Sequence, residues 1–162
     1  MRILLLGKYG QLGWELHRSL GPLGEVIALD YPEIDLSQPI QAQHAVRDAK
    51  PQVIVNASAY TAVDRAESEP QIAGAINALT PGVLAEEARR TGAALIHYST
   101  DYVFDGSQHH PYVENDTPNP LGVYGQSKLD GERAIQDVAG AYLILRTSAN
   151  HLSVLINNTF IT

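Results

Sequence analysis

The sequence predicts an α/β domain in which helices cover both faces of a parallel sheet. Short apolar runs alternate along the chain with longer segments whose apolar residues recur at helical spacing. The runs are apolar at successive residues, which is typical of strands buried on both faces. Glycine or proline stands where one kind of segment gives way to the next. Strands and helices that alternate in this way form right-handed crossovers, so we expect a doubly wound parallel sheet.

The predicted strands are five near-continuous apolar runs, at residues 2–6, 26–29, 53–55, 93–97 and 142–145. Between them, apolar side chains at helical spacing mark two helices. The first helix carries Leu12, Leu16 and Leu20 on one face. The second carries a longer set: Ile72, Ile76, Leu79, Val83 and Leu84.

Turn-forming residues give the expected boundaries of these elements. Gly21-Pro22 ends the first helix, Pro70 opens the second, and Asn119-Pro120 opens a further one. Gly92 and Gly140 stand where helices should stop before strands. Segment 107–120 is rich in His, Pro, Asn and Asp, and it predicts one long functional loop.

Composition narrows the class of protein. A chain of 162 residues is long enough for one well-buried domain. Cysteine is absent, which excludes disulfides, thiolate zinc sites and cysteine nucleophiles. With a net charge of −7 and no basic run, we expect no nucleic-acid partner. The chain has no apolar run long enough to span a bilayer, so we expect no membrane partner and a cytoplasmic location.

A glycine-rich turn follows the first predicted strand. Residues 7–13, Gly-Lys-Tyr-Gly-Gln-Leu-Gly, form a G-x-x-G-x-x-G pattern between a strand and a helix. Glycine there permits a tight turn, a close approach of the backbone to a pyrophosphate, and close packing of helix on strand. Asp30, seventeen residues after Gly13, ends the second strand, where an acid accepts hydrogen bonds from an adenosine ribose. The pattern therefore predicts a dinucleotide-binding Rossmann fold. A Walker A loop is excluded, because Gly7-Lys8 lacks the preceding glycine and the following Ser or Thr.

A second motif lies at the start of a later predicted helix. Tyr124 and Lys128 are four residues apart, so both side chains lie on one helical face. There the ammonium group lowers the pKa of the phenol, which can then pass a proton to a carbonyl oxygen. Ser99 and Thr100 follow the fourth strand, at the edge of the sheet where ligands bind. Either hydroxyl is a candidate to hold that carbonyl oxygen.

Four longer blocks narrow the resemblance to one family. Residues 7–20 (GKYGQLGWELHRSL), 56–70 (NASAYTAVDRAESEP), 97–106 (HYSTDYVFDG) and 119–128 (NPLGVYGQSK) resemble the dTDP-4-dehydrorhamnose reductase family of extended short-chain dehydrogenases/reductases. The resemblance covers roughly residues 1–148, the family's N-terminal half. It implies reduction of the 4-keto group of dTDP-4-dehydro-L-rhamnose, a dTDP-linked deoxysugar, with NADPH or NADH as cofactor. The product, dTDP-L-rhamnose, serves bacterial surface polysaccharide, and the resemblance leaves a homodimer open.

The resemblance also assigns roles to residues of this chain. It makes Tyr124 the proton donor, Lys128 the residue that orients the nicotinamide ribose and tunes Tyr124, and Thr100 the catalytic hydroxyl in preference to Ser99. Asp101 lies beside Thr100 near the sugar. The cofactor-binding set implied in this way comprises Gly7, Gly10, Gln11, Leu12, Gly13, Asp30, Asp35, Leu36, Ala59, Tyr60, Thr61, Tyr98, Tyr124 and Lys128.

No metal site is expected. His109 and His110 are adjacent in a polar loop without a third ligand at metal spacing. Some family members use the position of Glu15 for an inter-subunit magnesium ion, but the partner carboxylates would lie beyond residue 162. Trp14 is left open as a core, interface or substrate-facing residue.

The resemblance weakens after Ser148. We therefore expect a Rossmann domain with the catalytic residues at 1–148 and a divergent apolar tail at 149–162, without the substrate domain that the family carries. A truncated product and a fragment of a longer protein both fit this pattern. Two alternative functions remain: a related sugar-nucleotide epimerase or dehydratase, and a regulatory protein that binds cofactor without catalysis.

Overall fold

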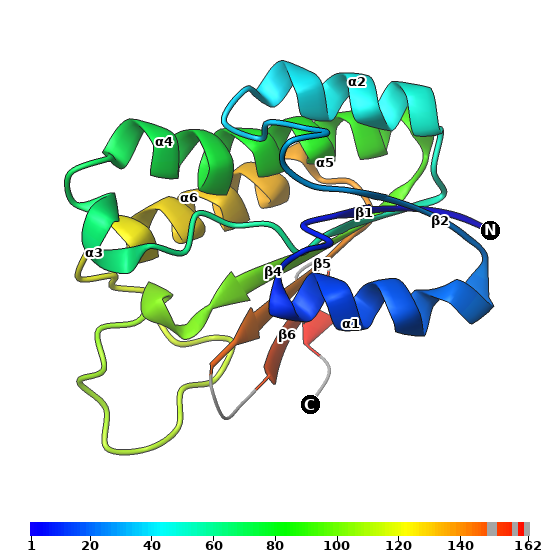
Figure 1. Ribbon diagram of the computed structural model, residues 1–162. Coiled ribbons are helices and arrows are strands. Elements are labelled where there is room, and N and C mark those ends of the chain that lie inside the picture. The colour runs from blue at the N-terminus through cyan, green and yellow to red at the C-terminus, as the bar shows by residue number, and fades with distance from the viewer. Residues whose placement is uncertain (149–151, 157–158, 161–162) are drawn as a thin grey trace.

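A single sheet runs through the protein, with its first five strands parallel (Figure 1). The computed structural model describes residues 1–148, 152–156 and 159–160. The parallel strands are β1 (Arg2–Leu6), β2 (Glu25–Leu29), β3 (Val53–Asn56), β4 (Ala94–Thr100) and β5 (Tyr142–Thr147). Strands β6 (Leu152–Ile156) and β7 (Thr159–Phe160) add antiparallel, giving the order β2-β1-β3-β4-β5-β6-β7. The five predicted strands are confirmed, whereas β6 and β7 were not predicted.

Helices lie on both faces of this sheet. Helix α1 (Gln11–Leu20) covers one face, while α2 (Pro39–Ala49), α5 (Thr80–Thr91) and α6 (Val123–Val138) cover the other (Figure 1). Shorter pieces connect them: the 3₁₀ turn η1 (Gly21–Leu23), α3 (Val63–Ala66), α4 (Pro70–Gly74), the π-helical turn η2 (Ala75–Leu79) and the 3₁₀ turn η3 (Asp101–Val103). The doubly wound α/β class is confirmed.

Alternation along the strands divides the core in two. Leu4 and Leu6 of β1 point into the larger cluster under α2 and α5, whereas Ile3 and Leu5 point toward α1. All four side chains are buried. Burial on both faces explains why the central strands are apolar at every position instead of at alternate positions.

The second predicted helix is confirmed as helical, but its apolar face is not buried as a whole. Ile72 and Leu79 are 44% and 62% exposed, while the polar Asn77 is buried. The π-helical turn η2 lies between α4 and α5 and adds a residue to one turn. This turn shifts the helical phase between α4 and α5, so the apolar side chains from 72 to 84 do not form one continuous buried face.

Other boundaries show smaller differences. Gly92 ends α5 in the left-handed conformation, as predicted, and η1 follows α1 at Gly21. Helix α6 begins at Val123 instead of at Asn119-Pro120, and α2 was not predicted. Within the described residues, no helix is long and apolar enough to cross a membrane.

Candidate cofactor and active site

The glycine turn joins β1 to α1 at the carboxyl edge of the sheet. Gly7 has a φ of +88°, a conformation that favours glycine. A Cβ on Gly13 would lie 1.8 Å from the carbonyl oxygen of Gly7, so this helix can pack against the turn only without a side chain there. These two glycines are explained by the fold itself.

Gly10 is different. A Cβ on Gly10 would meet only the Gly7 carbonyl oxygen, at an ordinary 3.5 Å, and its φ of −69° suits any residue. Gly10 is the N-cap of α1 and offers no side chain to cap the helix. The first-turn N–H groups, at Gln11 and Leu12, have no partner within the helix. They form the positive end of the helix dipole. A pyrophosphate fits this open cradle, and it would explain why Gly10 lacks a side chain.

Asp30 lies beside this turn. One of its carboxylate oxygens accepts a hydrogen bond from the Tyr9 N–H at 2.9 Å, and the other accepts from the Tyr31 N–H at 2.8 Å. The acid is therefore held at the edge of the cradle. It also ties the glycine turn to the end of β2.

Asp35 and Leu36, both predicted to bind the cofactor, have different surroundings. The Asp35 carboxylate accepts hydrogen bonds from the backbone and hydroxyl of Ser37. The Leu36 side chain packs in the larger core cluster, and its carbonyl accepts from the Thr80 hydroxyl at 2.8 Å. The side chain of Leu36 is thus occupied by the core.

The segment after β3 carries Ala59, Tyr60 and Thr61. Asn77, from the π-helical turn, accepts from the Tyr60 N–H and donates to the Tyr60 carbonyl oxygen. Its amide also donates to the Ser127 hydroxyl of α6 at 3.0 Å. Asn77 therefore fixes the segment after β3 against the helix that carries Tyr124. Sequence reasoning missed this residue, and its only signal was a polar side chain among apolar ones.

Tyr124 and Lys128 lie in the first turns of α6, facing the end of β4. Both are buried, and the Tyr124 ring meets the Tyr102 ring edge-on at 5.4 Å. Burial raises the pKa of the Tyr124 phenol and outweighs a hydrogen bond with the Thr100 hydroxyl, which lowers it. The lowered phenol pKa that the sequence predicted from Lys128 is therefore wrong. Thr100 also donates to the Asp101 carboxylate at 3.1 Å. The structure thus brings Tyr124, Thr100 and Asp101 together.

The Lys128 amine is turned toward β4. Its Nζ donates to the Tyr98 carbonyl oxygen at 2.7 Å and lies 3.4 Å from Nε2 of His97. Burial lowers the pKa of Lys128 to about 8, although the Glu132 charge acts in the opposite direction. The lysine therefore loses its proton at a lower pH than an ordinary lysine does.

Ser99 and Tyr98 have different surroundings from Thr100. The Ser99 hydroxyl donates to the buried Glu132 carboxylate, which also receives two N–H donors of Arg146. Ser99 is thus engaged by a buried ion pair, whereas the Thr100 hydroxyl lies against Tyr124, which favours Thr100 over Ser99 as the catalytic hydroxyl. Tyr98 alternates with His97, so its ring lies on the α1 face of the sheet, and only its backbone reaches Lys128.

A pocket of about 480 Å³ opens beside Tyr124. Asp101, Tyr102 and Tyr112 line it, together with part of the 104–122 loop. Asp105 holds this loop in shape by accepting from the Ser107 N–H, the Tyr112 hydroxyl and the Asn119 amide. These hydrogen bonds hold the pKa of Asp105 well below its usual range. The loop predicted from sequence thus forms a wall of this pocket.

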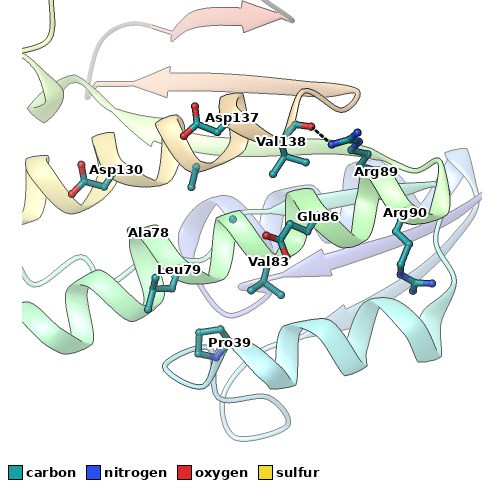
Figure 2. A pocket seen from close by; sticks show the side chains of 12 residues that line it. Pro39, Ala78, Leu79, Val83, Glu86, Arg89, Arg90, Asp130, Asp137 and Val138 are labelled. Atoms are coloured by element: carbon teal, nitrogen blue, oxygen red, sulfur yellow. Dashed lines mark hydrogen bonds between the residues drawn. The ribbon is translucent and has the colours of Figure 1, made fainter.

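A larger hollow, of about 1210 Å³, has a different lining. It runs between α5 and α6, and Figure 2 shows Leu79 and Val83 on one side and Asp130 and Asp137 on the other. None of the predicted site residues lines it. Its size therefore does not mark it as the active site.

Residues considered for metal binding lie apart from the site. His109, His110 and Glu15 are exposed, and Glu15 pairs with Arg18. Trp14, whose place the sequence left open, is also exposed, and Arg18 stacks over its ring. Throughout 1–148 and the two described strand segments that follow, no three His, Asp or Glu side chains are grouped to hold a metal ion.

Comparison with known proteins identifies the family. A family profile described as RmlD substrate binding domain matches residues 1–155. The chain belongs to this family. It is 52% identical over 152 residues to dTDP-4-dehydrorhamnose reductase of Salmonella typhimurium and 50% identical over 148 residues to that of Burkholderia thailandensis. Each match covers 91% of this chain, which spans about half the length of these relatives (51% and 50%). The predicted resemblance is confirmed, and the family match continues past Ser148.

Solved structures of the RmlD family have the same fold. The chain superimposes with a TM-score of 0.87 on dTDP-4-dehydrorhamnose reductase of Clostridium acetobutylicum, at 40% identity. The corresponding protein of Bacillus anthracis, solved in complex with NADP, gives a TM-score of 0.85 at 36% identity. Both matches cover 91% of this chain and 53% of the other chain.

Proposed function

We propose that this chain forms the cofactor-binding and catalytic part of a cytoplasmic dTDP-4-dehydrorhamnose reductase that uses NADPH or NADH. The reaction is reduction of the 4-keto group of dTDP-4-dehydro-L-rhamnose to give dTDP-L-rhamnose. The observation that carries the proposal is the position of Tyr124: buried on α6, hydrogen-bonded to Thr100 and open to the pocket at the end of β4. A phenol in this place can give its proton to a carbonyl oxygen in the pocket.

The cofactor site supports the same reading. The Gly10 cradle would hold the pyrophosphate on backbone N–H groups, and Asp30 would accept from the adenosine ribose. Bound NADPH or NADH would supply the hydride for the carbonyl carbon. A chain with a net charge of −7 and no basic run in its sequence would hold phosphates more by backbone N–H groups than by basic side chains.

On the substrate side, Thr100 and Asp101 would fix the sugar. The Thr100 hydroxyl would share the carbonyl oxygen with Tyr124, and the Asp101 carboxylate would accept from a sugar hydroxyl. The raised pKa of Tyr124 keeps the phenol protonated at neutral pH, so it is ready to act as an acid. Lys128 then stabilises the phenolate that remains.

Turnover in the presence of a complete substrate pocket tests the proposal. The chain joined to the C-terminal half of the Salmonella typhimurium relative should oxidise NADPH only when dTDP-4-dehydro-L-rhamnose is added, and nuclear magnetic resonance should identify dTDP-L-rhamnose. A hybrid protein that binds NADPH but leaves this sugar unreduced would contradict the proposed reaction. The homodimer is a separate prediction, which light scattering on the purified protein tests.

Relatives bear on the alternatives. Relatives 44–52% identical carry the reductase name, whereas an epimerase of Thermus thermophilus is 24% identical and shows the fold alone. The geometry around Tyr124 also gives a purely regulatory role no support, since that role needs no buried phenol beside a hydroxyl. The reductase is therefore the function that we propose.

A further inference from the structure

Strand β4 places a histidine directly beneath the lysine of the active site. His97 is fully buried, and its Nε2 lies 3.4 Å from the Lys128 Nζ. It comes from the face of β4 that α6 covers, two residues before Ser99 on the same face. The proposed reaction gives His97 no role, yet it is the side chain that meets the amine from the sheet.

Asn56 fixes the orientation of this histidine. It lies opposite His97 in the register of β3 and β4. Its Oδ1 accepts from both the backbone N–H and the hydroxyl of Ser58, which sets the direction of the amide. The Nδ2 group is thereby turned toward His97 Nδ1, at 3.0 Å. Because an amide NH₂ group only donates, Nδ1 of His97 must accept.

The proton of His97 then has one place to be. Burial lowers the pKa of His97 well below its ordinary value, and the Lys128 charge lowers it further, so the ring is neutral. A neutral imidazole carries one N–H, and Nδ1 is already the acceptor. The proton is therefore on Nε2, facing the Lys128 amine. Two donor groups face each other whenever the lysine is protonated.

We propose that His97, oriented by Asn56, is a positioning residue that sets the direction and the charge of the Lys128 amine. An ammonium group avoids the Nε2–H, keeps one N–H on the Tyr98 carbonyl oxygen and directs the others away from β4. A neutral amine instead accepts from the Nε2–H. The inference rests on the proposed role of Lys128, but its first two tests need no turnover.

Two of the groups that act on the charge of Lys128 are His97 on β4 and Glu132 on its own helix, α6. His97 on β4 opposes the ammonium form by its N–H dipole, whereas Glu132 on α6 favours it. Burial of the amine adds to the effect of His97. This balance keeps the lysine near the middle of its titration at mildly alkaline pH instead of fully charged.

The tautomer of His97 is the first test. A two-bond ¹H–¹⁵N correlation spectrum of the ¹⁵N-labelled chain should show His97 as the neutral Nε2–H form throughout pH 6 to 8. An Nδ1–H form or a charged ring would overturn the inference. This measurement uses the parent chain, so it does not depend on whether a variant folds.

The charge of Lys128 is the second test. In His97→Gln, the amide oxygen can take the place of Nε2 and accept from the ammonium group. The pKa of Lys128, followed by ¹⁵N resonance of its amine, should therefore rise by about one unit or more. The matched control is His44→Gln, at an exposed position on α2, which should leave Lys128 unchanged. An equal pKa of Lys128 in parent and His97→Gln would overturn the inference.

Turnover separates this inference from the proposed function. In the hybrid protein, His97→Gln should move the alkaline limb of the pH profile of kcat upward by about one unit, with little change in KM for the sugar. A variant whose kcat falls equally at every pH would show a merely structural role for His97 and would leave the proposed reaction standing. If the parent hybrid has no reductase activity, the proposed function fails. The tautomer of His97 and the pKa of Lys128 would still show whether His97 positions the Lys128 amine.

Discussion

A Cβ on Gly13 would lie 1.8 Å from the carbonyl oxygen of Gly7, so these two glycines set how closely α1 follows β1. Gly10, midway between them, has room for a side chain within the protein itself. The motif therefore needs its three glycines for two different physical reasons. Gly7 and Gly13 serve packing, whereas Gly10 is the position where we predict that a ligand needs the space.

Glycine substitutions should separate these causes. We expect Gly13→Ala to lower the free energy of unfolding by about 1–3 kcal/mol, because the helix must move off the turn. Gly10→Val should change stability by less than about 1 kcal/mol but abolish NADPH binding, because its side chain fills the phosphate cradle. Urea unfolding and a fluorescence titration with NADPH measure the two effects. Equal NADPH affinity in Gly10→Val and the parent would contradict the cofactor assignment.

Asp30 should influence the choice between the two nucleotides. Its carboxylate accepts from a ribose 2′-hydroxyl but repels a 2′-phosphate, so Asp30→Ala should weaken NADH binding more than NADPH binding. The comparison variant is Asp30→Asn, which removes the charge and keeps one acceptor oxygen, so it can accept from only one of the Tyr9 and Tyr31 N–H groups. Calorimetric titration of both nucleotides checks this. A variant that loses NADPH preferentially would show that Asp30 does not face the ribose.

Tyr124→Phe should separate proton transfer from binding. In the hybrid protein we expect kcat to fall at least about a hundredfold, the lower end for a positioned general acid. NADPH affinity should change little, because the ring and its edge contact with Tyr102 remain. Single-turnover kinetics with a parallel binding titration measure both. Activity that persists in Tyr124→Phe and disappears in Thr100→Ala would instead assign the proton to another group.

Glu87 should make stability depend on pH in a defined direction. Arg47 and then Arg90, against the effect of burial, lower the pKa of this buried carboxylate from 4.5 to about 2. The ion pair with Arg47 ties α2 to α5, whereas the pair with Arg90 lies within α5. A carboxyl group whose pKa is lower in the folded state stabilises the fold above pH 4.5 and loses that effect as pH falls toward 2. Glu87→Gln should therefore lower the free energy of unfolding by about 2 kcal/mol at pH 7, and by clearly less at pH 3.

Urea unfolding at the two pH values tests this. The exposed pair of Glu25 with Arg2 provides the control, since Glu25→Gln should have almost no effect at either pH. A difference between Glu87→Gln and the parent that is the same at pH 7 and pH 3 would contradict the expected linkage.

Local patterns in the sequence predicted much of the candidate site. The glycine turn, the spacing of Tyr124 and Lys128, and the hydroxyl after the fourth strand each involve neighbours along the chain. Their geometry follows from the helix or strand that carries them. The family resemblance then supplied the roles, which remain predictions until the variants above are measured.

Contacts between distant segments could not be predicted in the same way. Asn77 binds the backbone of Tyr60 and the hydroxyl of Ser127, which are 17 and 50 residues away in sequence. The contact of His97 with Lys128 joins residues 31 apart, on a strand and a helix. A polar residue within an apolar run indicates only that some partner must exist.

The sequence by itself determined the class of fold and the order of its parallel strands along the chain, because apolar periodicity and turn residues act over a few neighbours. Only the tertiary structure decided which apolar side chains are buried and how the active-site amine is held. Ile72 and Leu79 are exposed although they continue the apolar periodicity, and the pairing of β3 with β4 places Asn56 beside His97, which faces Lys128. The physical reason is that burial and protonation depend on all the atoms packed around a group, and packing joins residues far apart in the sequence.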